Sequence, residues 1–152
     1  MWLCKCDCGN YTTVSTHDLK RGHTQSCGCK GGDSRGVIKI KELLTQNNIP
    51  YTTEKTFLNC RFPDTNKYAR FDFFVNDKYL IEYDGEQHFG YNSNNNDNWW
   101  NDESHYKKLL EHDRFKNEWA KTNNIVLIRI PYTEVAKLSI EDLTPATSKF
   151  II

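Results

Sequence analysis

The chain has 152 residues, which is enough for one ordinary domain and a small appendage but too few for a large multidomain enzyme. Hydrophobic residues make up 38% and charged residues 26%, with eight glycines and four prolines, which excludes a disordered or collagen-like chain. Twenty Lys and Arg balance twenty Asp and Glu, so net charge neither favours nor excludes a nucleic-acid partner. The apolar runs are too short for a membrane span and no secretory signal opens the chain, so we expect a soluble protein of the cytoplasm.

Five of the six cysteines lie within the first 29 residues, in two short clusters about twenty residues apart. Two such thiolate clusters can close a tetrahedron around Zn²⁺, and the segment between them has too few apolar side chains for a core. A disulfide-stapled lobe of a secreted protein is the alternative. We therefore expect a zinc-binding module over residues 1–30, with a short strand at 11–14. The expected ligands are Cys6, Cys8, Cys27 and Cys29, with Cys4 as a substitute for one of them.

A glycine-rich polar stretch, residues 31–36, is typical of a linker and places a second domain at 37–152. Ser34 can cap a helix whose apolar residues Val37, Ile40 and Leu44 share one face, and which ends before Pro50. The pattern then predicts a strand at 51–57, a loop at 58–70 and two strands within 71–85 joined by a tight turn. An Asn-rich loop at 90–102, a helix at 103–122 and a strand at 125–130 follow. The order αβββαβ predicts an α/β fold with a mixed sheet flanked by helices.

Three carboxylates interrupt the apolar strands: Asp72 in the first, and Glu82 and Asp84 in the next. Burying unpaired carboxylates is costly, so they indicate a compensating cation, and oxygen ligands suit Mg²⁺ or Mn²⁺. Residues 82 and 84 share a face of their strand. Asp72 joins them if the turn has three residues, 76–78, and faces away if it has only two; we predict the three-residue turn. Solvent-facing carboxylates on an edge strand are the alternative.

Three further residues point to the same chemistry. His88 follows the strand that carries Asp84, where an imidazole could act as general base or contact a phosphate. On the second helix, Asp113 shares the stripe of apolar residues that faces the core, and Lys116 lies one turn later. A purely structural ion pair of Asp113 with Arg70 or Arg129 is the competing interpretation.

The string "RFDFFVNDKYLIEYDGEQHF", followed by "HDRFKNEWAKTNNIVLIRIPY", resembles the PD-(D/E)xK nuclease superfamily. The likeness is to phage and intron-associated homing endonucleases with a core similar to very short patch repair endonucleases, and it covers residues 34 to about 135. It implies a restriction-endonuclease-like core in which Asp72 and Glu82 are the motif acids and Asp84 takes the place of the motif lysine. It also implies active-site roles for His88 and Asp113. The cysteine pairs resemble small zinc-binding modules that precede nuclease domains in phage proteins.

One position departs from that family. Its first helix often begins Ser-x-Gly-Glu, with the glutamate thought to reach the active site, whereas this chain has Val37 at that place. Glu42 cannot replace the missing acid, because five residues further along a helix it has rotated roughly 140° away. The alternative role for the family's glutamate is to complete a capping box.

These features predict a Mg²⁺-dependent DNA endonuclease of the homing type that hydrolyses phosphodiesters. The partner would be double-stranded DNA, and the protein a monomer or homodimer in a bacterial cell or nucleoid, with phage origin as an option. Asp72, Glu82 and Asp84 would bind the metal, His88 would assist proton transfer, and Lys116 would stabilise phosphate charge. Lys20, Arg21, Lys30 and Arg35 would contact DNA phosphates, with Trp99 and Trp100 as the alternative contact region. A non-catalytic DNA-binding remnant and a mismatch-nicking repair enzyme are the alternative functions.

Overall fold

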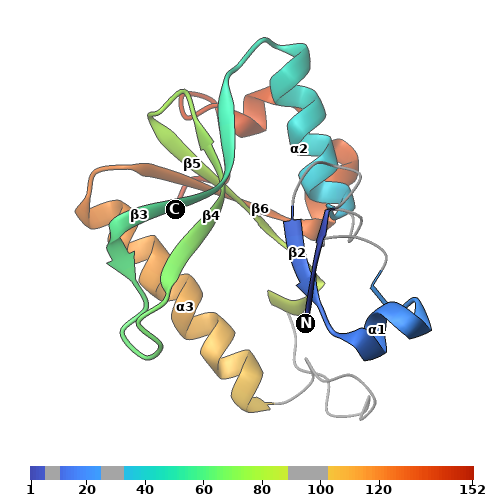
Figure 1. Ribbon diagram of the computed structural model, residues 1–152. Coiled ribbons are helices and arrows are strands. Elements are labelled where there is room, and N and C mark those ends of the chain that lie inside the picture. Colours follow the sequence, from blue (N-terminus) through green and yellow to red (C-terminus); the bar gives the residue numbers. More distant parts are fainter. Residues whose placement is uncertain (6–10, 25–32, 89–102) are drawn as a thin grey trace. The chain divides into compact units, whose positions relative to one another are not determined.

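The computed structural model describes residues 1–5, 11–24, 33–88 and 103–152 (Figure 1). The chain divides into two compact units, Met1–Ser34 and Arg35–Ile152, and each is described by itself. Among the described residues, no helix is long and apolar enough to cross a membrane.

The smaller unit contains a two-stranded antiparallel sheet, β1 (Trp2–Lys5) and β2 (Tyr11–Val14), and one short helix, α1 (Thr16–Arg21). The Ser15 hydroxyl accepts the Asp18 backbone N–H at 3.1 Å and caps the start of α1. Gly22 ends the helix with a positive φ of 67°. The strand predicted at 11–14 is confirmed, whereas β1 and α1 are too short to give a clear periodic signal.

The larger unit is built on a four-stranded mixed sheet in the order β3-β4-β5-β6. Strands β3 (Tyr51–Arg61), β4 (Tyr68–Val75) and β5 (Tyr79–Asp84) are antiparallel neighbours, and β6 (Val126–Pro131) is parallel to β5. Helix α2 (Arg35–Gln46) precedes the sheet, and α3 (Glu103–Thr122) crosses over from β5 to β6. The α/β class and the order αβββαβ are therefore observed. The topology makes β5 an interior strand, with a neighbour on each side.

Three parts of this unit differ from the sequence prediction. Strands β3 and β4 extend through most of the segment predicted as a loop, because Cys60 and Ala69 are fully buried. Helix α2 begins at Arg35, directly after the predicted cap Ser34, so the last two residues of the predicted linker 31–36 are helical. After β6, the chain forms two short 3-10 helices, η3 (Tyr132–Lys137) and η4 (Ile140–Leu143), which the sequence did not indicate.

The end of the chain runs antiparallel along the outer edge of β6. Ile151 forms an isolated bridge with Ile128. The Arg129 backbone N–H donates to the Phe150 carbonyl at 3.0 Å, and the Ile152 N–H donates to the Leu127 carbonyl at 3.0 Å. Strand β6 is thus hydrogen-bonded on both sides.

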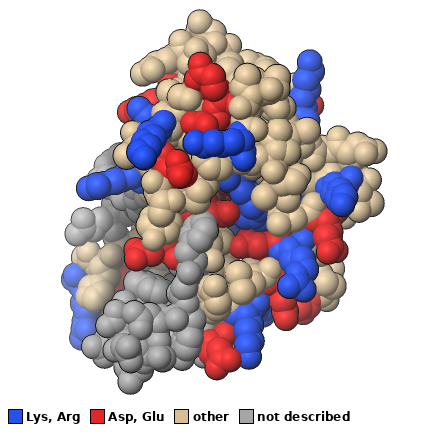
Figure 2. Space-filling model, turned by 180° about the vertical axis from the view of Figure 1, so that it is seen from behind, with Lys and Arg blue, Asp and Glu red and all other residues tan. Residues whose placement is uncertain are grey.

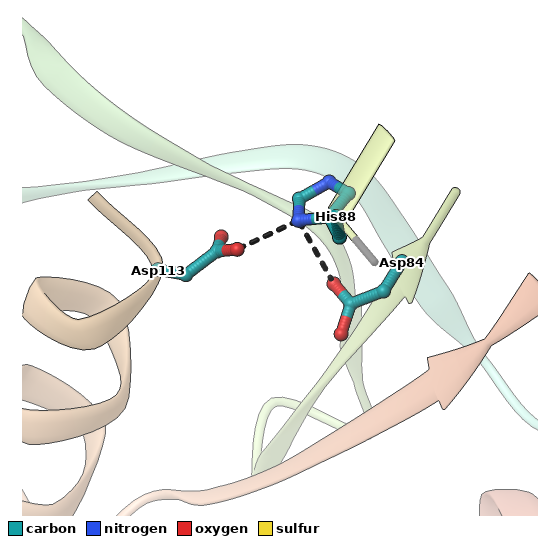
Figure 3. A group of neighbouring side chains, drawn as sticks. All are labelled: Asp84, His88 and Asp113. Atoms are coloured by element: carbon teal, nitrogen blue, oxygen red, sulfur yellow. Dashed lines mark hydrogen bonds and ion pairs between the residues drawn. The ribbon is translucent and has the colours of Figure 1, made fainter. Parts of the chain in front are cut away.

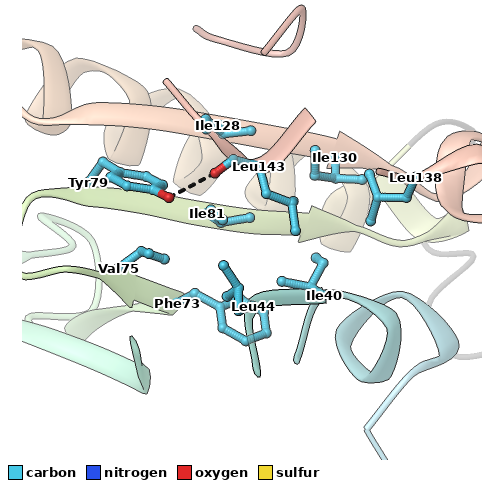
Figure 4. Close-up of a cluster of buried hydrophobic side chains, with 10 residues drawn as sticks. All are labelled: Ile40, Leu44, Phe73, Val75, Tyr79, Ile81, Ile128, Ile130, Leu138 and Leu143. Carbon is cyan, nitrogen blue, oxygen red and sulfur yellow. Dashed lines mark hydrogen bonds between the residues drawn. The ribbon is translucent and has the colours of Figure 1, made fainter. Parts of the chain in front are cut away.

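Each face of the sheet carries its own apolar cluster. On one face, residues of the sheet pack against α2 and the C-terminal segment, and the Tyr79 hydroxyl donates to the Leu143 carbonyl at 2.9 Å (Figure 4). This cluster contains Ile40, Leu44, Phe73, Val75, Tyr79, Ile81, Ile128, Ile130, Leu138 and Leu143. The other face packs against α3 and contains Cys60, Ala69, Phe71, Leu80, Ala120 and Leu127. The two helices α2 and α3 therefore cover opposite faces (Figure 1).

The start of α2 touches β5 through a glycine. A Cβ atom added to Gly36 would lie 2.1 Å from the Tyr83 ring, which is far inside van der Waals contact. The next residue, Val37, packs against the apolar cluster on the α2 face. Only a residue without a side chain fits at position 36.

We expect Gly36→Ala to lower the free energy of unfolding by about 1–3 kcal/mol. Alanine favours a helix by up to about 1 kcal/mol over glycine, but overpacking against the Tyr83 ring outweighs that gain. Urea denaturation measures the change. In a Tyr83→Leu background the same substitution should become neutral or stabilising, and an equal loss in both backgrounds would contradict the steric explanation.

Candidate functional site

The site is built on the side of β5 that faces α3. Leu80, Glu82 and Asp84 alternate with residues that point to the other face, as the period of a strand requires. Glu82 and Asp84 are only 5% and 9% exposed. The alternative of solvent-facing carboxylates on an edge strand is therefore wrong.

The turn between β4 and β5 has the predicted three residues, Asn76 to Lys78. Val75 pairs with Tyr79 and Phe73 with Ile81, which is the register that brings Asp72 towards Glu82. Asn76 and Asp77 both have positive φ, 53° and 52°, a conformation that Asn and Asp tolerate better than other side chains.

Asp72 interrupts the regular pleat of β4. Phe71 packs on the α3 face, whereas Phe73, two residues later, packs on the α2 face. Between them, the Asp72 Oδ2 accepts the backbone N–H of Tyr83 at 2.8 Å. The carboxylate is thus held against β5 beside Glu82, where its negative charge adds to that of Glu82.

Glu82 forms a buried ion pair with helix α3. The Lys116 Nζ lies 2.5 Å from the Glu82 Oε1, and both side chains are almost fully buried. Burial raises the pKa of Glu82 to about 8, although the Lys116 ammonium acts in the opposite direction; the neighbouring Asp72 charge raises it further. A carboxyl group with this pKa exchanges its proton near neutral pH.

A second cluster lies one step further along β5. The His88 Nδ1 is 2.6 Å from the Asp113 Oδ2 and 3.9 Å from the Asp84 Oδ1 (Figure 3). His88 lies in a short 3-10 helix, η1 (Glu86–His88), that follows β5, and Asp113 projects from α3. Among the described residues, these three form the one group of His, Cys, Asp or Glu side chains whose ligand atoms all lie within 4.8 Å of one another.

The two aspartates of this cluster have different environments. Burial raises the pKa of Asp84, with the Arg129 guanidinium opposing it. Burial also acts to raise the pKa of Asp113, but the hydrogen bond with His88 and the charge of Arg129 outweigh burial and lower it. An ionised carboxylate can only accept hydrogen bonds, so the His88 Nδ1 carries the hydrogen of the short contact.

Arg129 is the site residue that sequence reasoning assigned only a structural role. It comes from β6, opposite Glu82 in the parallel register, and its Nη1 donates to the Asp84 Oδ1 at 2.7 Å. Its Nη2 lies 3.4 Å from the Asp113 Oδ1, and its Nε donates to the Asn117 Oδ1 at 2.6 Å. The structural pairing of Asp113 with Arg129 thus exists alongside its contact with His88. The signal that could have revealed Arg129 is a charged residue inside an apolar strand.

The other arginine considered as a partner, Arg70, lies elsewhere. It pairs with Glu54 at 3.3 Å, and both side chains are more than 60% exposed. Arg70 therefore takes no part in the buried network.

The donor types fit a hard divalent ion. Four carboxylates (Asp72, Glu82, Asp84 and Asp113) and two fixed cations (Lys116 and Arg129) leave two formal negative charges when His88 is neutral and every acid is ionised. One divalent cation would balance that charge, and carboxylate oxygens are the ligands that Mg²⁺ and Mn²⁺ prefer. Each of the three strand carboxylates already has a partner on one oxygen: Arg129 on Asp84, Lys116 on Glu82 and the Tyr83 N–H on Asp72.

The structure describes only some of the remaining predicted residues. Lys20 and Arg21 are exposed in the last turn of α1, and Arg35 is exposed at the start of α2. Lys30 and the four favoured cysteines lie outside the described residues, and so do Trp99 and Trp100. Cys4 is described, in β1 opposite Thr12. Figure 2 shows Lys and Arg interspersed with Asp and Glu on the face it presents, in keeping with the balanced charge.

Comparison with protein-family models, with curated proteins and with solved structures found no match to this chain.

The raised pKa of Glu82 predicts a pH-dependent stability. The folded protein holds this proton up to about pH 8, whereas the unfolded chain releases it near the ordinary value of 4.5. The stability that Glu82 contributes is therefore complete below about 4.5 and is lost as pH rises to about 8, by on the order of a few kcal/mol. Asp84 acts in the same direction.

Urea denaturation at several pH values, without added divalent ions, measures this dependence. Glu82→Gln should flatten the fall in unfolding free energy across this range, and Glu54→Gln, at an exposed glutamate of β3, should leave it unchanged. A Glu82→Gln profile as steep as that of the unmodified protein would contradict the assignment.

Proposed function

We propose that this chain is a metal-dependent endonuclease of the homing type, which hydrolyses phosphodiester bonds in double-stranded DNA. The observation that carries the proposal is the convergence of six acid, base and cationic groups, from β4, β5, η1 and α3, on one side of β5. They are Asp72, Glu82, Asp84, His88, Asp113 and Lys116. Buried ionisable groups with shifted pKa values are costly for folding and cluster where chemistry is done.

Asp72 and Glu82 would hold Mg²⁺ or Mn²⁺, with Asp84 completing or tuning the set. When bound, such an ion neutralises charge on a phosphate and lowers the pKa of a water molecule. Lys116, whose ammonium lies on Glu82, would stabilise negative charge developing on the phosphate. In the family that this chain resembles, the motif lysine stands on the strand, at the position that Asp84 occupies here. Lys116 of α3 would supply the positive charge instead.

His88 would transfer the proton. Its Nδ1–H is bonded to Asp113, which leaves the Nε2 lone pair to accept a proton from water or, once protonated, to donate to the leaving group. Asp113 would orient the ring and stabilise its protonated form, as a buried carboxylate does for an imidazole base.

Val37 favours a second candidate function. It packs against the apolar cluster at the position where related nucleases often carry a glutamate. The chain would then be a DNA-binding remnant without catalysis. A mismatch-nicking repair enzyme would use the same chemistry on another substrate.

Cleavage of supercoiled plasmid in the presence of Mg²⁺ tests the proposal. Asp72→Asn and Glu82→Gln should each slow cleavage by at least about 100-fold, the scale of losing one group that stabilises transition-state charge. Asp77→Asn, in the exposed β4–β5 turn, is the matched control and should cut normally. Cleavage without a divalent ion, or undiminished in both variants, would contradict the mechanism, and DNA binding without any cleavage would support the remnant.

Zinc in the smaller unit is a separate proposal that rests on the cysteine spacing. Elemental analysis should find about one tightly bound zinc per chain, and a double Cys27→Ser, Cys29→Ser variant should lose it. Chelation should loosen residues 1–30 and leave the larger unit folded, which backbone amide exchange can follow. A metal-free protein with its N-terminal cysteines oxidised would contradict this proposal.

A further inference from the structure

Part of the sheet formed by β3 and β4 has one face open to solvent. At one end of these strands, Tyr51, Phe73 and Val75 pack in the apolar cluster under α2. Towards the loop that joins them, the two strands pack against α3 on one side, and the alternating side chains on the other side are exposed (Figure 1). These exposed side chains, here termed the open face, are Thr56, Leu58, Arg61, Tyr68 and Arg70.

Arg61 is held in place on the open face with donors to spare. It lies opposite Tyr68 in the strand register, and its guanidinium stacks over the Tyr68 ring, 4.0 Å from the centroid. It donates to the Tyr68 hydroxyl and, through Nη1, to the Asn66 carbonyl at 3.3 Å. A guanidinium has five N–H groups, so three remain for a ligand. Because the side chain is already ordered, binding through it loses little conformational freedom.

Arg70 is the second cation of the open face. It lies opposite Thr56 in the register and pairs with Glu54 at 3.3 Å. Both side chains of this pair are more than 60% exposed. Exposed ion pairs contribute little to stability, so another anion can take the place of the Glu54 carboxylate. Between Thr56 and Arg61 along β3, Leu58 projects into solvent and is 88% exposed.

The open face continues along β4 into the carboxylate cluster. Asp72 follows Arg70 by two residues, a rise of roughly 7 Å along a strand. The rise from Tyr68 to Asp72 is roughly 14 Å, a length over which one strand of B-DNA presents about four phosphates. A phosphate bound at Asp72 through a metal ion would therefore have its neighbours along the same DNA strand above Arg70 and Arg61.

We propose that the open face binds the phosphate backbone of the DNA strand beside the cleavage position, through Arg61 and Arg70. The identity of the ligand rests on the proposed function, but its binding can be measured without cleavage. Arg61 is the preordered donor, Arg70 exchanges Glu54 for a phosphate, and Leu58 packs against the sugars. Contacts of this kind set the position of the duplex and carry no base specificity.

The affinity of the full chain for a labelled DNA duplex of mixed sequence, measured at several salt concentrations without added divalent ions, tests the inference. The double variant Arg61→Gln, Arg70→Gln should bind roughly 10- to 100-fold more weakly at low salt. The slope of log affinity against log salt should fall by about 2, since each phosphate contact contributes about 0.9. Lys121→Gln, Lys149→Gln removes the same charge from exposed positions and should change neither quantity.

Single substitutions give tests of both signs. Leu58→Glu places a negative charge on the open face at a position outside the core, and it should weaken binding by roughly 10-fold. Leu110→Glu, at an exposed position of α3, is the matched control and should bind normally. Glu54→Gln should bind DNA more tightly than the unmodified protein, because it frees Arg70 and removes an acid beside the open face.

An unchanged salt slope in the folded Arg61→Gln, Arg70→Gln variant, with normal binding by Leu58→Glu, would overturn the inference and leave the nuclease proposal standing. Weakened binding by these variants in a protein that does not cut DNA would uphold the open face and favour the remnant. An unmodified chain that binds no DNA would reject both proposals. A dimer in solution that Leu58→Glu dissociates, with DNA affinity unchanged, would assign the open face to a second copy of the chain instead.

Discussion

The burial of two carboxylates on the middle strand of the sheet is the constraint on which the rest of the structure depends. Strand β5 has β4 and β6 as neighbours, α2 on one face and α3 on the other, so Glu82 and Asp84 are largely withdrawn from solvent. A buried carboxylate costs several kcal/mol unless a cation is paired with it. Lys116 and Arg129 meet that requirement from two different elements.

The pairings of Glu82 with Lys116 and of Asp84 with Arg129 depend on the order of strands and helices in the fold. A crossover connection is needed to join β5 to the parallel β6, and here α3 makes it over the face that carries the carboxylates. Lys116 and Asn117 follow Asp113 by three and four residues, so α3 presents all three on one side. This part of the crossover helix thus supplies a partner for each of three site residues. Asp113 contacts His88, Lys116 contacts Glu82 and Asn117 contacts Arg129.

Much of the fold could be predicted because its signals are local. The helix at 103–122 is observed with the predicted limits, and the register of the β4–β5 hairpin follows from the length of its turn. The ends of β3 and β4 were missed because Cys60 and Ala69 are small and lie among polar residues, so their burial leaves little periodic pattern. Of the partners of Arg129, the sequence suggested Asp113 but not Asp84 or Asn117, since a long side chain can reach several neighbours and only the packed structure selects among them.

The first turn of α2 is shaped by close packing against β5. Gly36 lets the helix approach the Tyr83 ring, and Val37 completes the apolar cluster. Tyr83 is also the residue whose backbone N–H binds Asp72. Helix α2 therefore rests against Tyr83, the residue of β5 whose backbone holds the candidate metal ligand Asp72.

Residues 150–152 pair with β6, and this pairing includes the backbone of Arg129. The backbone N–H of Arg129 is bonded to Phe150, on the side of β6 away from β5. Proteins open locally in cooperative units whose free energies of opening differ widely within one structure. Local opening of residues 150–152 would remove the hydrogen bonds along one edge of β6, so the strand that carries Arg129 is held in part by residues that supply no side chain to the cluster of Asp84, His88 and Asp113.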